Sequence, residues 1–253
     1  MNDRILSIET LNQAPMHGLL TVAPTYDEKE NVAEFMARVA AEGSDLLIVD
    51  DASPDGTAEI VRQTAAALKV RVSLMCRRGK LGLGTAYVDA YRWVLAHQPA
   101  YDVIVQMDVD FSHEPSMIPK LAAAARSSGV AVGSRYVLGG SMPDWPFHRR
   151  LLSWGANLYA RTILNLRFGG YQLYDGTAGF VAWRRDALAR VFSAPIMSRG
   201  YAFQIETKFR ATRQGYRPVE LPITFRDRRL GVSKISRAIV FETLLLPWKI
   251  RLP

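Results

Sequence analysis

Residues 45 to 57 carry an apolar run that ends in a turn: Asp45-Leu46-Leu47-Ile48-Val49-Asp50-Asp51-Ala52-Ser53-Pro54-Asp55-Gly56-Thr57. Four consecutive branched apolar residues, without polar alternation, are typical of a strand that is buried on both faces of a sheet. Ser, Pro, Asp and Gly in succession favour a tight turn, and the pattern that begins at residue 57 is helical. The stretch therefore predicts a strand, a turn and a helix in direct succession.

The same unit recurs along the first half of the chain. We predict further strands in the Val-, Ile- and Leu-rich runs at residues 19–23, 70–76 and 102–108. Helical patterns lie between and after them, at residues 31–41, 57–68, 85–96 and 115–125. This alternation predicts an α/β fold with a Rossmann-like, mostly parallel sheet flanked by helices. Such sheets bind their ligands beyond the carboxyl ends of the strands.

The rhythm changes after a further strand that we predict at residues 130–133. Two adjacent glycines and two prolines indicate a loop at residues 139–146. Helices are predicted at residues 148–164 and 202–213, and a strand at residues 218–225. Because no linker-like segment separates the two parts, we predict a single domain.

Acidic residues follow the predicted strands at the edge where a ligand is expected. Asp108 and Asp110 flank Val109 at the end of the strand at residues 102–108, and alternate residues of a strand share a face. Two neighbouring carboxylates repel each other unless a cation lies between them, and hard oxygen ligands suit Mg²⁺ or Mn²⁺. In the turn after the strand at 45–50, we expect Asp55 to be structural and Asp51 to face a ligand.

Charge is distributed unevenly over a chain of 253 residues. Residues 1–125 hold 11 Lys and Arg against 17 Asp and Glu, whereas residues 126–253 hold 21 against 7, so their net charges are −6 and +14. A basic half indicates an anionic partner, which could be a phosphorylated substrate, a membrane surface or nucleic acid. Cys76 is the single cysteine, which excludes an internal disulfide and fits a reducing compartment. We expect no secretory signal at the N-terminus and no spanning helix in the apolar stretch at residues 239–248.

Together these segments resemble the family 2 glycosyltransferases of the GT-A fold, and among them the dolichol-phosphate and polyprenol-phosphate mannose synthases. The resemblance covers residues 19 to 234 and depends on the order and spacing of several motifs. The motifs are Pro24-Thr25-Tyr26-Asp27-Glu28-Lys29-Glu30-Asn31, Val49-Asp50-Asp51-Ala52-Ser53-Pro54-Asp55-Gly56-Thr57, Gly82-Leu83-Gly84-Thr85-Ala86-Tyr87, Met107-Asp108-Val109-Asp110-Phe111-Ser112-His113, Gly133-Ser134-Arg135-Tyr136, Asp175-Gly176-Thr177-Ala178-Gly179-Phe180, Phe225-Arg226-Asp227-Arg228 and Gly231-Val232-Ser233-Lys234.

The resemblance implies an inverting transfer of mannose from GDP-mannose to a polyprenyl phosphate, with Mg²⁺ or Mn²⁺ at the donor diphosphate. The residues implied to bind the nucleotide-sugar are Pro24, Tyr26, Glu28, Val49, Asp51, Asp108, Val109, Asp110, Arg135, Arg228 and Lys234. Asp108, Asp110 and Arg228 are the expected catalytic residues, and Asp108, Asp110 and Ser112 the candidate metal ligands. Arg135, Arg149 and Ser153 are expected to meet the phosphate of the acceptor. None of the four histidines has metal-ligand spacing, and we assign them no role.

The same resemblance divides the chain. Residues 1–17 are expected to be an N-terminal extension, and residues 18–234 the GT-A catalytic domain, with the nucleotide-sugar half at 18–133 and the acceptor half at 134–234. Residues 235–253 are an amphipathic segment that either lies on a membrane or packs on the core. We expect a peripheral enzyme on the cytoplasmic face of a membrane, and the sequence leaves open whether a separate subunit anchors it.

Two alternatives remain from the sequence. The same fold could use another donor, such as UDP-glucose. A basic module that binds nucleic acid without catalysis belongs to another class, but it leaves the pairs of aspartates unexplained and calls for aromatic residues interleaved with the basic ones. We therefore expect a nucleotide-sugar and a polyprenyl phosphate as partners, and no nucleic acid.

Overall fold

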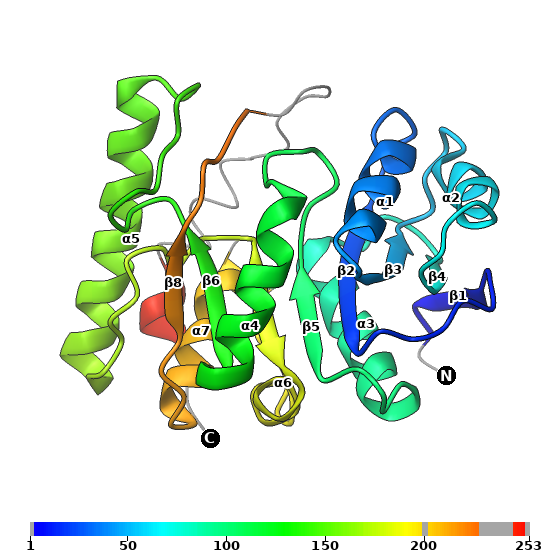
Figure 1. Ribbon diagram of the computed structural model, residues 1–253. Helices are drawn as coiled ribbons and strands as arrows, with labels where there is room; N and C mark the ends of the chain where they lie inside the picture. The colour runs from blue at the N-terminus through cyan, green and yellow to red at the C-terminus, as the bar shows by residue number, and fades with distance from the viewer. Residues whose placement is uncertain (1–2, 199–201, 228–244, 251–253) are drawn as a thin grey trace.

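The computed structural model describes residues 3–198, 202–227 and 245–250. Within these ranges eight strands form one mixed sheet in the order β1-β4-β3-β2-β5-β7-β6-β8 (Figure 1). The strands are β1 (Ile5–Thr10), β2 (Leu19–Thr25), β3 (Asp45–Asp50), β4 (Val72–Arg77), β5 (Val103–Gln106), β6 (Val130–Ser134), β7 (Val181–Arg184) and β8 (Val219–Pro222). β4, β3, β2 and β5 are parallel neighbours, while β1 and β7 run antiparallel to the strands beside them. The predicted α/β fold with a mostly parallel sheet is confirmed.

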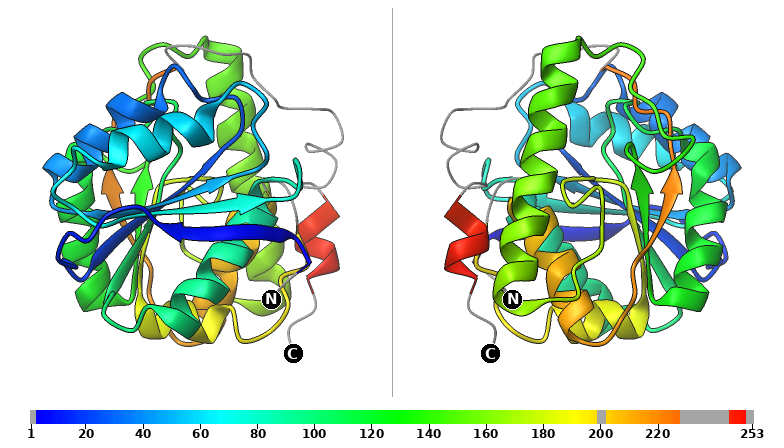
Figure 2. Two further views of the ribbon diagram at one scale, coloured as in Figure 1. Left: turned by 90° about the vertical axis from the view of Figure 1, so that its right-hand side faces the viewer. Right: turned by 90° about the vertical axis from the view of Figure 1, so that its left-hand side faces the viewer.

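Helices cover both faces of this sheet (Figure 2). The helices and the single 3-10 turn of the described residues are α1 (Val32–Ala41), α2 (Thr57–Ala65), α3 (Leu83–His97), η1 (Pro115–Met117), α4 (Ile118–Ser128), α5 (Phe147–Phe168), α6 (Arg185–Val191) and α7 (Ala202–Arg213). One core cluster joins the sheet to α1, α2 and α4, and the other joins it to α3, α5, α6 and α7. No helix of the described ranges combines the length and the apolar character needed to span a bilayer.

The strand at residues 45–50 shows why its apolar run does not alternate. Leu46 and Ile48 pack in the core cluster on the side of α1, and Leu47 and Val49 pack in the cluster on the opposite face. All four side chains are buried. Because each buried Leu, Ile or Val side chain contributes about 1.5–3 kcal/mol of transfer free energy, the uninterrupted apolar run fixes β3 in the centre of the sheet.

Three parts of the sheet differ from the sequence-based expectation. β5 ends at Gln106, so Asp108 lies in the loop after the strand and not in the strand itself. Residues 5–10, inside the expected N-terminal extension, form β1 and pair with β4, so they extend the sheet. β7 and α6 were not predicted: the strand Val181–Arg184 is short and runs directly into the helix Arg185–Val191, so neither has a turn signal to separate it from the other.

The described part of the C-terminal segment packs on the core. Residues 245–249 form a helical turn, and Leu246 and Ile250 are buried in the same cluster as α5 and α7. Arg167 of α5 donates hydrogen bonds to the main-chain oxygens of Pro247 and Trp248. The rest of the segment expected at residues 235–253 lies outside the described residues.

Candidate active site

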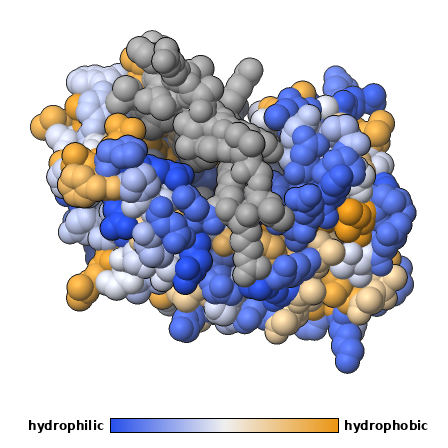
Figure 3. All heavy atoms as spheres, turned by 90° about the horizontal axis from the view of Figure 1, so that it is seen from above, coloured by the Kyte–Doolittle hydropathy of each residue, from blue (hydrophilic) through white to orange (hydrophobic). Residues whose placement is uncertain are grey.

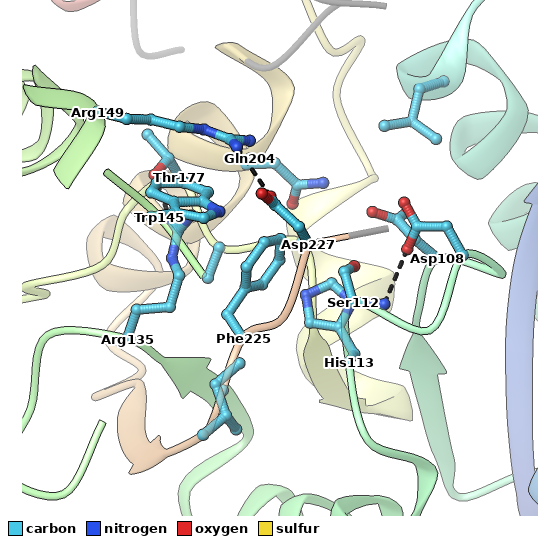
Figure 4. Close-up of a pocket in the computed structure, with 16 residues that line it drawn as sticks. Asp108, Ser112, His113, Arg135, Trp145, Arg149, Thr177, Gln204, Phe225 and Asp227 are labelled. Atoms are coloured by element: carbon cyan, nitrogen blue, oxygen red, sulfur yellow. Dashed lines mark hydrogen bonds and ion pairs between the residues drawn. The ribbon is translucent and has the colours of Figure 1, made fainter. Parts of the chain in front are cut away.

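A pocket of about 310 Å³ opens where the parallel strands end (Figure 4). Its lining comes from residues that follow β5, β6 and β8, precede β7, or stand near the first turns of α3, α5 and α7. The lining residues are Leu83, Asp108, Asp110, Ser112, His113, Gly133, Arg135, Trp145, Arg149, Thr177, Ala178, Gly179, Gln204, Ile223, Phe225 and Asp227. The sheet topology thus collects residues that are more than 140 positions apart in the sequence.

The carboxylate wall of this pocket consists of Asp108 and Asp110. The side chain between them, Val109, and the one after them, Phe111, are buried in the core, so the loop alternates between core and pocket. Phe111 adopts a positive φ of 59°, a conformation that few non-glycine residues take and that often marks functional loops. The main-chain nitrogen of Ser112 donates to Asp110 Oδ1 at 3.1 Å. The packing of the alternate apolar residues directs both carboxylates to the same pocket.

The carboxylate wall also decides what kind of metal this pocket could hold. The described residues contain no group of three or more His, Cys, Asp and Glu side chains able to form a complete metal cage. Asp108, Asp110 and the hydroxyl of Ser112 are hard oxygen donors that line one pocket. Mg²⁺ is usually bound by one or two carboxylates together with substrate phosphates and water. The donor set therefore fits a metal whose coordination a diphosphate completes.

Arg135 forms the buried part of the arginine wall on the other side of the pocket. Its Nε and Nη2 donate to the two carboxylate oxygens of Asp175 at 2.8 and 2.7 Å, and Nη2 also donates to Thr177. Burial alone would raise the pKa of Asp175, but the charge and hydrogen bonds of Arg135 lower it below its usual value. The guanidinium also lies 5.4 Å from the ring centroids of both Trp145 and Phe225. Arg135 is therefore already paired in this structure and is fixed as part of the wall.

Arg149, from the first turn of α5, forms the more exposed part of the arginine wall. Its guanidinium stacks 4.0 Å from the ring centroid of Trp145, and Nη1 lies 2.8 Å from Asp227 Oδ1. More than a third of its side chain is exposed. Because an exposed ion pair contributes little free energy, Asp227 can exchange for another anion at low cost.

A buried lysine holds the loop that carries Thr177, Ala178 and Gly179 into the pocket. Lys208 of α7 is fully buried and donates to the main-chain oxygens of Gly176 and Ala178 at 2.9 and 2.7 Å. Burial lowers its pKa to about 7, although the charge of Asp175 opposes this shift. A Cβ on Gly179 would stand 3.5 Å from Asp108 Oδ2, an ordinary van der Waals distance, so this part of the loop lies directly beside the carboxylate wall.

Several residues that line the pocket were missed by the sequence analysis, among them His113 and Gln204. His113 is buried between Phe180 and Phe225, its Nδ1 has no hydrogen-bond partner, and burial lowers its pKa to about 4. Gln204 is held by a hydrogen bond from Gln106, the last residue of β5. His113 stands three residues after Asp110, and Gln204 ends the segment Gly200-Tyr201-Ala202-Phe203-Gln204, which is part of the family resemblance; these were the available signals.

Residues expected to bind the nucleoside lie beside this pocket, not in its lining. Pro24, at the end of β2, is in register with Val49 of β3, and β2 is the neighbour of β5. The side chain of Val49 is buried in the core, as is that of Val109, which leaves only their main chains to contact a ligand. The structure thus brings the residues expected to bind the nucleoside to the ends of β2 and β3, next to the pocket.

Two more residues of the nucleoside group have partners of their own. Lys80 Nζ lies 3.9 Å from the centroid of the Tyr26 ring. Glu28 accepts a hydrogen bond from the side chain of Asn31. Both contacts order the loop after β2, and neither covers the pocket that contains Asp108.

A buried ionic network holds the side chain of Asp51 in place. Its carboxylate pairs with Arg77, and its Oδ2 accepts hydrogen bonds from the main-chain nitrogens of Leu81 and Gly82. Arg77 is buried and is also paired with Asp89 of α3. Burial raises the pKa of Asp51 despite the neighbouring guanidinium. That Asp51 contacts the nucleoside remains a prediction, and in this structure the carboxylate fixes the loop before α3.

The remaining predictions have different outcomes. Asp55 is structural, as expected, because it accepts hydrogen bonds from Thr57 and from the main-chain nitrogen of Lys29. Ser153 is on α5, four residues after Arg149, and is not among the residues that line the pocket. Arg228 and Lys234 lie outside the described residues.

The chain is similar in sequence to proteins of a known family. The sequence pattern of Glycosyl transferase family 2 matches residues 21–192. The chain is 44% identical over 229 residues to the undecaprenyl-phosphate mannosyltransferase of Micrococcus luteus. The aligned region covers 90% of this chain and 91% of that protein. It is 40% identical over 242 residues to the polyprenol monophosphomannose synthase of Mycolicibacterium smegmatis, covering 94% and 89% of the two chains.

The fold also has a solved counterpart. The crystal structure of glucosyl-3-phosphoglycerate synthase from Mycobacterium tuberculosis is similar with a TM-score of 0.58, at 18% identity, over 92% of this chain and 80% of that one. At this level of identity the similarity concerns the fold alone, and it supports the expected GT-A architecture.

Proposed function

The chain belongs to glycosyl transferase family 2, and we propose that it transfers mannose from GDP-mannose to a polyprenyl phosphate. The substrate class is that named for two relatives at 44% and 40% identity, each matched over about nine tenths of this chain. The observation that carries the proposal is the pocket, in which two carboxylates face two arginines across the carboxyl edge of the sheet (Figure 4). Such a site suits a reaction in which two phosphate-bearing substrates must meet.

The donor lies, in this proposal, across the ends of β2, β3 and β5. The loops of Tyr26 and Asp51 contact the nucleoside, and the diphosphate extends towards Asp108 and Asp110. Parallel α/β sheets bind nucleotides at this edge, and the first half of the chain supplies all of these residues. Arg228 and Lys234 complete the diphosphate site.

A divalent metal, Mg²⁺ or Mn²⁺, fits the carboxylate wall of this site. Asp108 and Asp110 would hold it, with Ser112 as a further oxygen ligand. When bound, the metal offsets the negative charge that develops on the departing nucleoside diphosphate. Arg228 and Lys234 would add positive charge for the same purpose.

The acceptor phosphate lies on the opposite side, against Arg149 and the pocket rim formed with Arg135. One of its oxygens attacks the anomeric carbon of the sugar, the new carbon–oxygen bond forms, and the bond from that carbon to the donor diphosphate breaks with inversion. A phosphate monoester is largely ionised near neutral pH, since its second pKa is about 6. The reaction therefore needs no general base, and His113, which is neutral when buried with a pKa of about 4, is not required to be one.

We place this reaction at the cytoplasmic face of a membrane, where the enzyme is peripheral. A single cysteine fits a reducing compartment, and the acceptor is a lipid. The division into a nucleotide-sugar half at residues 18–133 and an acceptor half at 134–234 is part of the same proposal.

The direct test combines donors and acceptor with the purified protein. GDP-mannose and a short-chain, water-soluble prenyl phosphate should give a prenyl-phosphate mannose, detected by mass spectrometry, in the presence of Mg²⁺ or Mn²⁺. UDP-glucose serves as the alternative donor in a parallel reaction. Transfer from UDP-glucose and not from GDP-mannose would show that UDP-glucose is the donor. Transfer from neither would overturn the proposed function.

Nucleotide binding gives a second measurement that does not depend on turnover. A ligand that binds only the native state raises its stability by RT ln(1 + [L]/Kd). GDP with Mn²⁺ should therefore raise the melting temperature more than UDP with Mn²⁺ does, and removal of the metal with a chelator should reduce the shift.

A further inference from the structure

A buried row of three polar side chains ends at the pocket. Tyr91 of α3 donates a 3.0 Å hydrogen bond to Gln106 Oε1, and Gln106 Nε2 donates a 2.8 Å hydrogen bond to Gln204 Oε1. These three residues, here called the glutamine relay, are at most 2% exposed. Of the three, Gln204 lines the pocket. Because buried polar groups are normally paired, each donor and acceptor of the relay can be followed from one residue to the next.

The main chain fixes the direction in which both amides point. Gln106 Nε2 also lies 3.0 Å from the main-chain oxygen of Gly179, which can only accept a hydrogen bond. This contact identifies the nitrogen of Gln106, and the atom of Gln204 that faces it must then be the oxygen. The opposite orientation of Gln204 would place two amide nitrogens against each other, donor against donor. The relay therefore holds the Gln204 amide with its nitrogen directed away from Gln106.

The nitrogen of Gln204 has no acceptor of its own in the described part of the chain. The hydrogen bonds of those residues pair the Gln204 amide through its oxygen and leave Nε2 unpaired. In the close-up view this amide lies between Arg149 of the arginine wall and Asp108 (Figure 4). Since a buried donor without an acceptor destabilises a protein, a position of this kind is explained best by a ligand that supplies the acceptor.

The backbone of Gln204 is fixed as well as its side chain. Lys208 Nζ donates to the main-chain oxygen of Gln204 at 3.1 Å, and the same ammonium group binds the main-chain oxygens of Gly176 and Ala178. α7 and the loop before β7 are thus joined twice, through Lys208 and through Gln106. A donor that is held at both ends loses little conformational freedom when a ligand binds, which favours selective recognition.

The chemistry of Gln204 indicates which ligand atom it binds. An amide nitrogen is a neutral donor and suits a neutral oxygen such as a hydroxyl, whereas phosphate oxygens are matched better by arginine or a metal. In the proposed function the two walls bind phosphate-bearing groups, and the transferred sugar lies between them. Gln204 has this intermediate position, since its partner Gln106 also binds Gly179, which lies beside Asp108. Seen from above, hydrophilic side chains are spread over this face of the molecule, as suits a polar ligand (Figure 3).

We propose that Gln204 is a specificity-determining residue, whose Nε2 donates a hydrogen bond to one hydroxyl of the sugar that is transferred. Gln106 and Tyr91 are positioning residues, because they act through Gln204. The inference rests on the proposed function, which supplies the sugar. A site built to bind a hydroxyl rejects an analogue without it, since the buried donor is then left unpaired. Gln204 thus selects the donor sugar and takes no part in proton transfer.

Analogues of the donor test this hydrogen bond together with a variant of the residue. Gln204→Met keeps the length of the side chain, and its kcat/KM with GDP-mannose should fall about tenfold to a hundredfold. In a panel of GDP-mannose analogues that each lack one hydroxyl, the wild type should show a similar loss for one analogue. Gln204→Met should show no further loss for that analogue, because the same hydrogen bond can be lost only once. Gln63→Met is the matched control, since Gln63 is exposed on α2, where it donates to Glu59.

Tyr91→Phe tests the relay without any change in the pocket. It keeps the ring and removes the hydrogen bond to Gln106, so discrimination against the same analogue should fall about twofold to fivefold. The affinity for GDP should not change. A purely structural role of Tyr91 would lower the melting temperature and leave the discrimination between the two donors as it is. If Gln204→Met does not fold, the wild type and Tyr91→Phe still decide the test with the same analogues.

The outcomes separate this inference from the proposed function. Losses that add for every analogue in Gln204→Met would overturn the inference even when mannose is transferred. A loss of affinity for the prenyl phosphate alone would move Gln204 to the acceptor and overturn it as well. The proposed function fails if the wild type transfers no mannose. Calorimetry then decides, because the wild type should prefer GDP-mannose over GDP about tenfold more than Gln204→Met does. Equal preferences in the two proteins would overturn the role of Gln204.

Discussion

The two walls of the pocket carry opposite charges and hold them in different ways. Asp108 and Asp110 belong to one short loop, and the buried residues Val109 and Phe111 position them locally. Each arginine of the opposite wall is instead paired with an aspartate far along the chain: Arg135 with Asp175 and Arg149 with Asp227. The carboxylate wall places two negative charges on one short loop, whereas the arginine wall is assembled from ion pairs between distant segments.

This difference suggests separate tasks for the walls. Concentrated carboxylates attract a cation, which the donor diphosphate then shares. An arginine that is already paired with an aspartate is not an open phosphate site. Its contribution to phosphate binding depends on how readily a phosphate can replace the aspartate. Asp175 is fully buried and cannot leave, but Asp227 is half-exposed and can. We therefore expect Arg135 to support the structure of the pocket and Arg149 to meet the acceptor.

The largest effect is expected from the carboxylate wall. Asp110→Asn keeps the size of the side chain and removes a charge that we propose to hold the metal, so kcat should fall about a thousandfold or more while the melting temperature changes little. Asp102→Asn at the opposite end of β5 is the control, because it removes only an exposed ion pair with Arg126. Near-normal activity of Asp110→Asn in saturating metal would show that the wall does not hold the metal.

The second effect concerns stability and separates the two arginines. Arg135→Ala leaves the carboxylate of Asp175 buried without its partner, which should reduce the free energy of unfolding by about 3–5 kcal/mol. Arg149→Ala breaks an exposed pair and should reduce it by less than about 1 kcal/mol. Urea denaturation of both variants measures the difference. Similar losses for the two would remove the distinction between a structural and a functional arginine.

The smallest effect is expected for Arg149 in catalysis. Loss of a charged hydrogen bond to phosphate costs about 1.5–3 kcal/mol, so kcat/KM for the prenyl phosphate should fall about tenfold to a hundredfold in Arg149→Ala. The affinity for GDP, measured by thermal shift, should not change. Arg150→Ala is a suitable control on the same helix, because Arg150 donates to main-chain oxygens of Pro143 and Trp145 and does not line the pocket. A parallel loss of GDP affinity in Arg149→Ala would move this residue to the donor side.

The two halves of the chain also differ in how well the sequence predicts them. In the first half, the apolar run of β3 and the turn with Asp55 are local signals, and the structure confirms both. In the second half, β7 is only four residues long and lies between two antiparallel neighbours, a position that tertiary pairing alone decides. The expected strand at residues 218–225 is also shorter in the structure, where β8 ends at Pro222.

The sequence by itself determined most of the strands, the turn that contains Asp55 and the pair Asp108 and Asp110, because periodicity and short motifs report on neighbours within a few residues. The family resemblance also gave Arg135 and Arg149 as candidates. Only the tertiary structure decided that Arg135 meets Asp175, 40 residues away, and that Lys208 holds the loop after Asp175. The exposure of the apolar side chains of Phe147, Leu151 and Trp154 on α5 was likewise decided there, since an apolar helical pattern is the same whether a helix packs on the core or faces outward. Burial and ion pairing depend on contacts between distant segments, and no local pattern encodes which of those contacts form.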